Sequence, residues 1–199
     1  MNKKSITYTF PDGRVYVGDI KDNVPNGIGN MKFSNHDVYE GNWEKGKMHG
    51  RGKYYFYDSQ KEKFSSSYEG TFVNNRFEGT GVRKYSDRTI YIGQWQNGMR
   101  TGNGGFWFVD GSYFWGIWRF DKMVRGMLRL QNGDIYDGEF KDGVFEGYGK
   151  YHWKSDGSFF EGLFKEGKCF SGTKVFPDGK INIVKDGNST GFLPSKVIE

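Results

Sequence analysis

The sequence predicts an all-β protein built as an elongated, single-layer, twisted antiparallel sheet of stacked β-hairpins. Aromatic residues and glycines alternate with the two-residue period of a β-strand, as at Tyr39, Gly41 and Trp43. This alternation recurs at a nearly constant spacing, and a fixed period indicates a repeat array. Glycine makes up 31 of 199 residues and aromatic residues 19%, so the expected core consists of rings and of glycines that make room for them.

The clearest copy of the repeated unit runs from Tyr39 to Phe56. Its alternation stops at residues 45–47, where Lys-Gly-Lys predicts a turn. Gly50 and Gly52 then resume the pattern. Two alternating segments joined by a short turn predict a β-hairpin. Because side chains alternate across a strand, the glycines and the rings are expected on one face.

Seven copies of this unit can be aligned on their first glycine. The glycines are Gly18, Gly41, Gly70, Gly93, Gly116, Gly138 and Gly162, with steps of 23, 29, 23, 23, 22 and 24 residues. Two residues before them stand Tyr16, Tyr39, Tyr68, Tyr91, Phe114, Tyr136 and Phe160 (the first column). Two residues after them stand Ile20, Trp43, Phe72, Trp95, Trp118, Phe140 and Phe164 (the second column). A third column closes each unit: Phe33, Phe56, Tyr85, Phe108, Leu130, Trp153 and Phe176.

These columns place the repeat array in residues 1–184 and leave residues 185–199 as a C-terminal tail. The seven repeats lie near 15–36, 38–58, 67–88, 90–111, 113–133, 135–157 and 159–179. The stretch ITYTFPDG at residues 6–13 is expected to be an N-terminal half-repeat that caps the array. The stretch INIV at residues 181–184 is expected to form a last strand.

A single repeat is not expected to be stable alone. Each large ring buries about 150–250 Å², which stabilises by about 4–6 kcal/mol, whereas each ordered residue costs about 1–2 kcal/mol of backbone entropy. Neighbouring hairpins must therefore stack, and we expect each strand glycine to leave space for a ring of the adjacent hairpin.

The longest spacing, between the second and third repeats, contains the polar insertion DSQKEKFSSS at residues 58–67. We expect a flexible surface loop at a turn, which a repeat protein tolerates easily. The alternative is a functional one, in which the segment is a partner-specific protrusion or is phosphorylated on its serines.

The fifth repeat departs from the consensus and provides the candidate partner-binding site. Its loop is one residue shorter, and Val124 stands where another repeat has a glycine. Methionine adapts to a partner's shape, and arginine is favoured at interfaces. The predicted site consists of Arg119, Lys122, Met123, Val124, Arg125, Met127 and Arg129. The alternative is ordinary drift in a repeat that still stacks, and the seventh repeat has the same short loop with less basic charge.

The unit resembles the MORN repeat (membrane occupation and recognition nexus). The pattern YxGxWxxGxxHGxGxxxF is nearly literal over Tyr39–Phe56, and YxGxWxxGxxxGxG recurs over Tyr91–Gly104. The resemblance covers roughly residues 6–184. It implies a repeat array of the predicted kind and an interaction role, because similar proteins serve as scaffolds of cilia, flagella, basal structures or the cell cortex. It does not imply an activity: enzymes that carry these repeats, such as methyltransferases and lipid kinases, also carry a catalytic domain.

Enzymatic chemistry is not expected, and we predict no catalytic residue, no cofactor and no metal site. No CxxC or HExxH motif and no closely spaced histidine pair is present. The one cysteine, Cys169, excludes an internal disulfide and suits a reducing compartment. No secretory signal, lipidation motif or membrane-spanning apolar run is found. The net charge of +5 is modest, and nucleic acid is not an expected partner because the rings are needed in the core.

Two functions remain from different classes. The first is a non-enzymatic scaffold or adaptor that binds other proteins, in a cytoskeletal, ciliary, flagellar or cortical assembly of the cytoplasm. The second is a peripheral membrane protein that binds acidic phospholipid head groups at the inner membrane surface. Attraction to such lipids amounts to about 1 kcal/mol per basic residue near the surface, and most lysines here have acidic neighbours, so the first is favoured. Exposed edge strands also allow a homo-oligomer.

Overall fold

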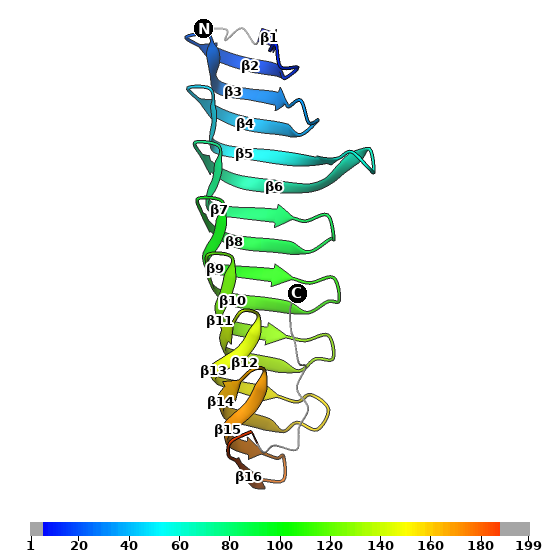
Figure 1. Ribbon diagram of the computed structural model, residues 1–199, viewed down its shortest axis with the longest axis vertical. Coiled ribbons are helices and arrows are strands. Elements are labelled where there is room, and N and C mark those ends of the chain that lie inside the picture. Colours follow the sequence, from blue (N-terminus) through cyan, green and yellow to red (C-terminus); the bar gives the residue numbers. More distant parts are fainter. Residues whose placement is uncertain (1–5, 188–199) are drawn as a thin grey trace. The chain divides into compact units, whose positions relative to one another are not determined.

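The computed structural model describes residues 6–187, and all regular secondary structure in this range is β-strand (Figure 1). Most of the predicted C-terminal tail, residues 188–199, lies outside the described residues. The chain divides into two units, residues 1–99 and residues 100–199, which are described separately below.

In the first unit, each strand pairs antiparallel with the next one along the chain. The strands are β1 (Ile6–Thr9), β2 (Val15–Lys21), β3 (Val24–Lys32), β4 (Val38–Glu44), β5 (Lys47–Asp58), β6 (Lys63–Val73), β7 (Arg76–Lys84) and β8 (Ile90–Gln96). The predicted half-repeat at residues 6–13 provides β1.

The second unit follows the same rule of pairing between consecutive strands. Its strands are β9 (Met99–Trp107, whose first residue lies at the division), β10 (Tyr113–Arg119), β11 (Lys122–Arg129), β12 (Ile135–Lys141), β13 (Val144–His152), β14 (Phe159–Lys165), β15 (Lys168–Val175) and β16 (Ile181–Val184). The predicted last strand is β16. The prediction of an all-β array of antiparallel hairpins is confirmed.

A row of glycines crosses each unit, because glycine pairs with glycine on successive strands. In the first unit the row is Gly18, Gly29, Gly41, Gly52, Gly70, Gly81 and Gly93. In the second it is Gly104, Gly116, Gly126, Gly138, Gly149, Gly162 and Gly172. On the terminal strands the row meets branched aliphatic residues, since Ile6 pairs with Gly18 and Val184 pairs with Gly172.

The first-column rings are fully buried over this row. A Cβ atom on Gly41 would lie 2.6 Å from the hydroxyl of Tyr39 and 2.5 Å from the Cα of Gly52. The glycines of β4 and β5 therefore accommodate the ring of their own hairpin, and the expected space for a ring of the adjacent hairpin was wrong. We call the face that carries these rings the ring face, and the opposite side of each sheet the outer face.

The second column links neighbouring hairpins. The indole Nε1 of Trp43 donates a hydrogen bond to the carbonyl of Gly29 in the preceding hairpin at 3.0 Å. Its ring meets Tyr39 and Tyr16 edge-on, with centroid distances of 5.1 and 5.6 Å. Ile20 is the exception, because this side chain near the start of the first unit is exposed.

The third column does not lie in strands, with one exception. Phe33, for example, follows β3, and its backbone N–H closes a turn on the carbonyl of Asp37 at 2.9 Å. Only Phe56 lies within a strand, and all seven side chains are half-buried. The alternation of the sequence extends past the strand ends here, because each turn begins on the ring face.

A fourth column, which the sequence did not reveal, faces the second column just after each hairpin turn. Its members are Pro25, Met48, Phe77, Met123, Phe145 and Cys169, each paired with a second-column residue, and Arg100 follows its turn at the same spacing. Phe77 stacks on Tyr68 with 3.7 Å between ring centroids, and its carbonyl accepts the N–H of Gly98 from the following turn at 2.9 Å. The column therefore helps to hold five turns on the hairpin before them, because the following turn donates an N–H to the carbonyls of Pro25, Met48, Phe77, Arg100 and Phe145.

The fifth and seventh repeats are shortened in a β-bulge, and their turns keep two residues. In the regular sixth repeat, Gly138 pairs with Gly149 and Phe140 with Phe145, so β13 contains two extra residues. One of them, Gly147, has a φ of +74°, which favours glycine. In the fifth repeat Val124 is the single extra residue, and the position that requires glycine is missing. The expected loop position of Val124 was wrong, because Val124 and the glycine of the regular repeat, Gly147, both lie within strands, β11 and β13.

The insertion at residues 58–67 forms strand more than loop. β5 extends to Asp58 and β6 begins at Lys63, so that only residues 59–62 form the turn. Figure 1 shows this hairpin as the one with the longest strands. The expectation of a flexible loop was wrong, because Tyr55 and Tyr57 pair with Ser67 and Phe64 and continue the ladder.

Candidate protein-interaction surfaces

The structure separates the seven residues of the predicted site. Met123 belongs to the fourth column and is 6% exposed, so it packs inside the protein. Lys122 leaves the turn and forms an ion pair with Asp142, with 2.6 Å between Nζ and Oδ1. Val124 is half-buried in the bulge. The other four lie on the outer face: Arg119, Arg125, Met127 and Arg129.

On the outer face these four residues join apolar side chains that the sequence interpretation missed. Register pairs Met127 with Trp115 and Arg125 with Ile117. On the other side of β10, Trp115 pairs with Gly105, and Tyr113 pairs with Trp107. We call this surface the Trp–Arg face; it consists of Trp107, Tyr113, Trp115, Ile117, Arg119, Arg125, Met127 and Arg129.

Two indole rings form its centre. A Cβ atom on Gly105 would lie 2.6 Å from Cε3 of Trp115 and 2.8 Å from Cη2 of Trp107. Both rings therefore lie over Gly105, which has no side chain to displace them. Trp115 remains 52% exposed, Ile117 45% and Trp107 38%, so the centre of the face is apolar and in contact with solvent.

The arginines of this face are available for binding. In the described part of the chain, the side chains of Arg119, Arg125 and Arg129 have no hydrogen bond, ion pair or ring contact, and Arg119, Arg125 and Arg129 are exposed. Arg100 shows the contrast, because its Nε donates to Oδ1 of Asp121 at 2.9 Å. Within the described range, the Trp–Arg face therefore carries three arginines without an ion pair next to its tryptophans, and on the neighbouring strand β12 Glu139 lies opposite Arg125 and Asp137 opposite Met127.

A sequence signal for this face was present at the positions between the aligned columns. In the second repeat these outward positions are polar, Glu40 and Asn42. In the fifth repeat they are Trp115 and Ile117. Comparison of these columns between repeats identifies the face, whereas a search for basic residues alone also collects Lys122 and Met123.

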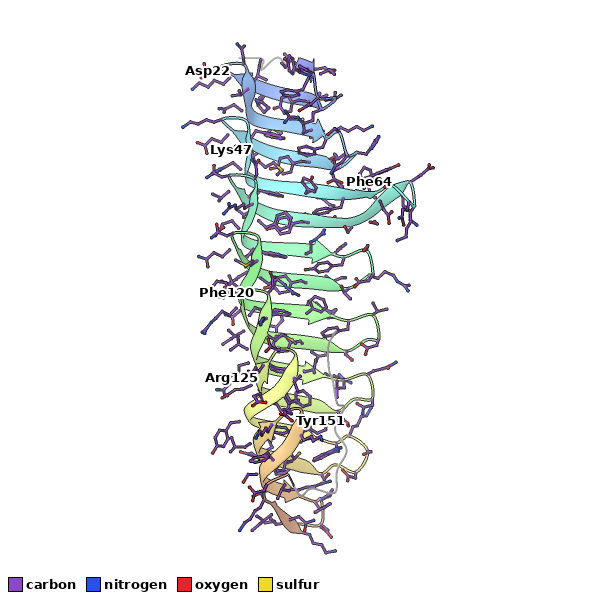
Figure 2. The ribbon with its side chains drawn as sticks, viewed as in Figure 1. Asp22, Lys47, Phe64, Phe120, Arg125 and Tyr151 are labelled. Carbon is purple, nitrogen blue, oxygen red and sulfur yellow. The ribbon has the colours of Figure 1, made fainter. Side chains whose placement is uncertain are left out.

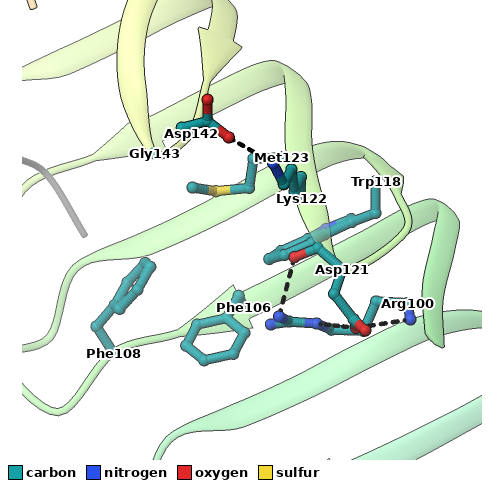
Figure 3. A pocket seen from close by; sticks show the side chains of 9 residues that line it. All are labelled: Arg100, Phe106, Phe108, Trp118, Asp121, Lys122, Met123, Asp142 and Gly143. Carbon is teal, nitrogen blue, oxygen red and sulfur yellow. Dashed lines mark hydrogen bonds and ion pairs between the residues drawn. The ribbon is translucent and has the colours of Figure 1, made fainter. Parts of the chain in front are cut away.

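A pocket opens on the ring face of the second unit (Figure 3). Its volume is about 310 Å³, and its lining comprises Arg100, Phe106, Phe108, Trp118, Asp121, Lys122, Met123, Asp142 and Gly143. The guanidinium of Arg100 lies over the Trp118 ring, 4.4 Å from its centroid. The hydrogen bond from Lys122 is the main cause that lowers the pKa of Asp142 below its usual value of 3.8. The pocket thus combines an apolar floor with a rim of two acidic and two basic groups.

The described residues show neither a metal-binding cluster nor an activated cysteine. Residues 6–187 contain no group of three or more His, Cys, Asp or Glu side chains placed to hold a metal ion. Burial raises the pKa of the Cys169 thiol to about 12, whereas reactive cysteines have a lowered pKa. Within the same range no helix suited to crossing a bilayer is found.

Comparison with known proteins places this geometry in a family. The family model described as "MORN repeat" matches residues 16–38, 39–61, 68–90, 91–113 and 136–158, which together make up more than half of the chain. The matches correspond to the first four repeats and the sixth, so five of the seven predicted repeats are matched. The fifth and seventh repeats, with the shorter bulge, are not.

Known proteins are similar to this chain in sequence, and a solved structure is similar to it in fold. Alsin of Rattus norvegicus is 30% identical over 143 residues, which is 66% of this chain and 8% of that protein. Phosphatidylinositol 4-phosphate 5-kinase 1 of Oryza sativa subsp. japonica is 43% identical over 44 residues, 22% of this chain and 6% of that protein. The chain thus spans a small part of these relatives. The wild-type TCP10 domain of Danio rerio CPAP has a similar fold, with a TM-score of 0.51 at 13% identity over 90% of this chain and 83% of that one.

Proposed function

The chain belongs to the MORN-repeat family, and from this premise we propose that it is a non-enzymatic interaction module that binds an acidic protein segment through the Trp–Arg face. The observation that carries the proposal is the pair of exposed indoles over Gly105 beside three unpaired arginines.

The apolar centre supports a protein partner. Exposed apolar patches with polar rims mark interaction sites, and tryptophan, methionine and arginine are enriched in the centres of interfaces. In protein complexes, a few such residues cause most of the loss of binding energy that is measured when interface side chains are truncated. Trp115 and Met127, which pair on adjacent strands, are the natural seat for one large apolar side chain of the partner.

The arginines determine the charge of the partner. A guanidinium binds a carboxylate through two parallel hydrogen bonds, and Arg125 and Arg129 lie on the same face of β11 with Met127 between them. A segment that places acidic residues on both sides of a leucine or an aromatic residue would match this order. A basic segment would meet like charges and be rejected.

For the cellular setting we propose a scaffold or adaptor in a cytoskeletal, ciliary, flagellar or cortical assembly of the cytoplasm. The support is the family resemblance, because proteins with similar repeats serve as scaffolds of such assemblies. Acidic phospholipids are the second candidate partner, because tryptophan is enriched where proteins meet the membrane surface and basic clusters attract anionic lipids.

The test measures binding of the full chain to an array of short peptides in which leucine or phenylalanine is flanked by Asp and Glu. The variant Arg125→Ser/Arg129→Ser should weaken capture at least about tenfold, which corresponds to about 1.4 kcal/mol. Rising salt should weaken binding as well. The matched control is Arg51→Ser/Arg88→Ser, which removes the same charge from exposed positions of the first unit.

Equal losses for the two double variants would refute a defined site, because they would mean that net charge alone drives binding. Vesicles rich in phosphatidylserine form a second arm. Binding to vesicles without capture of any acidic peptide, and lost in the Arg125→Ser/Arg129→Ser variant, would replace the peptide by the lipid surface.

A further inference from the structure

One hairpin turn of the second unit carries an unusual residue. The first residue of the two-residue turn is polar in the other six repeats: Asp22, Lys45, Asn74, Asn97, Asp142 and Glu166. In the turn between β10 and β11 it is Phe120. All seven residues have a positive φ, and that of Phe120 is +49°. Asn and Asp tolerate this conformation, whereas a bulky residue adopts it at a cost.

The Phe120 side chain contributes no ring contact to the packing of the described residues. Its side chain is 66% exposed and projects from the edge of the ribbon where the turns lie (Figure 2). No ring contact or cation–π contact joins it to any other residue between 6 and 187. An exposed aromatic on an unfavourable backbone favours a role outside the folded monomer.

The pocket of Figure 3 begins at the next residue. Asp121 and Lys122 line it, and its apolar floor includes Trp118 and Met123. Its volume of about 310 Å³ is ample for a phenyl ring, since a cavity of about 150 Å³ accepts benzene. The exposed ring of Phe120 and a pocket large enough for such a ring therefore lie at the same turn, the one between β10 and β11.

We propose that Phe120 and this pocket are the two halves of a self-complementary contact between two copies of the chain. In a two-fold symmetric dimer the same patch of each copy meets the other, so the ring and the pocket must both lie on that patch, as they do here. The rim supports a second copy over a strongly charged partner, because its basic groups, Arg100 and Lys122, balance its acidic groups, Asp121 and Asp142. The dimer goes beyond the proposed function, and none of the residues that line the pocket belongs to the Trp–Arg face.

The contact is small for an interface, since stable ones bury about 1,200–2,000 Å², and we expect a weak dimer. Sedimentation equilibrium of the full chain up to about 200 µM should give a concentration-dependent dimer with a Kd of tens to hundreds of micromolar. Phe120→Asn should weaken it at least tenfold. This variant should fold, because Asn97 occupies the same turn position in another repeat. Tyr148→Asn removes a similarly exposed ring away from the pocket and should dimerise like the wild type.

A complementation experiment tests the exchange itself. Phe108→Ser alters the pocket lining and keeps Phe120, whereas Phe120→Asn keeps the pocket, so each variant alone should dimerise at least tenfold more weakly than the wild type, and more weakly than a mixture of the two. Their mixture retains one intact contact per heterodimer and should dimerise more weakly than the wild type. A wild type that stays monomeric at the highest concentration would overturn the proposal. A dimer that persists in Phe120→Asn would also overturn it, and would favour pairing through edge strands instead.

Discussion

The glycine row makes a prediction that separates two effects of the same chemical change. Gly52→Ala adds a methyl group that would overlap the hydroxyl of Tyr39 and lie 2.5 Å from its ring atoms Cε2 and Cζ. The ring cannot move aside, because Phe72 and Trp43 contact it edge-on at centroid distances of 4.9 and 5.1 Å. Gly98→Ala also adds a methyl group, yet no atom lies within 4 Å of it, and the only obstacle is a φ of +84°.

The two costs differ in size. Overpacking costs about 1–3 kcal/mol, and complete expulsion of the ring would expose about 150–250 Å², equivalent to about 4–6 kcal/mol. We therefore expect Gly52→Ala to destabilise by about 3–5 kcal/mol. For Gly98→Ala, the left-handed conformation costs about 1–2 kcal/mol, offset by about 0.4–1 kcal/mol from the restricted unfolded chain. The expected net loss is about 1 kcal/mol or less.

Urea titration followed by tryptophan fluorescence measures both. With a slope of about 2 kcal/mol per molar urea, Gly52→Ala should lower the midpoint by about 2 M, and Gly98→Ala by at most about 0.5 M. The double variant Tyr39→Ala/Gly52→Ala should lose less than the sum of its single changes, because the methyl group then has room. Equal midpoints for Gly52→Ala and Gly98→Ala would show that the ring does not occupy the glycine row.

Three further outcomes follow from the packing and the charges. Trp95→Ala should destabilise by about 3–5 kcal/mol, because its buried ring contacts Tyr68, Phe77 and Tyr91, whereas Lys61→Ala in the β5–β6 turn should stay within about 0.5 kcal/mol in the same titration. Cys169 should resist iodoacetamide in native protein at pH 8 and react on unfolding, because burial raises its pKa to about 12; rapid native labelling would contradict the packing of β15. Hydrogen bonds from the N–H and hydroxyl of Thr89 lower the pKa of Asp87 below 3.8. A carboxyl group whose pKa is lowered by folding stabilises the folded state fully above its unfolded pKa, and this stabilisation is lost as pH falls through the folded pKa. The unfolding free energy should therefore be level from pH 7 to 5 and fall below about pH 4, and the fall should be less steep in Thr89→Val.

The sequence was sufficient for the parts of the fold that depend on parity. Tyr39, Gly41 and Trp43 occupy alternate positions of one strand, and the alternation alone places them on the ring face. Register shifts inside the hairpins were not predictable in this way. A β-bulge changes which residue faces which, so Val124 looked like a substituted loop glycine although it is an extra residue within a strand.

The candidate site was only partly predictable for a related reason. Arg125, Met127 and Arg129 lie on one face, because alternation within β11 places them together, and their role in binding stays a prediction. Met123 was misplaced, because the bulge reverses the side to which the residues before it point. Trp115 was overlooked, because residues between the aligned columns were treated as background.

The aliphatic residues that flank the glycine rows give the array a property of linear polymers. Each glycine is a propagating unit, since it presents a bare site to the strand on either side and accepts another strand of the same kind. Val184, buried opposite Gly172, is a terminating unit, because its branched side chain fills the place where another glycine would continue the row. A duplicated hairpin inserted anywhere along a row keeps glycine opposite glycine, whereas one added beyond Val184 does not. The number of hairpins in such a protein can therefore change by whole copies in its interior while its terminal strands stay the same.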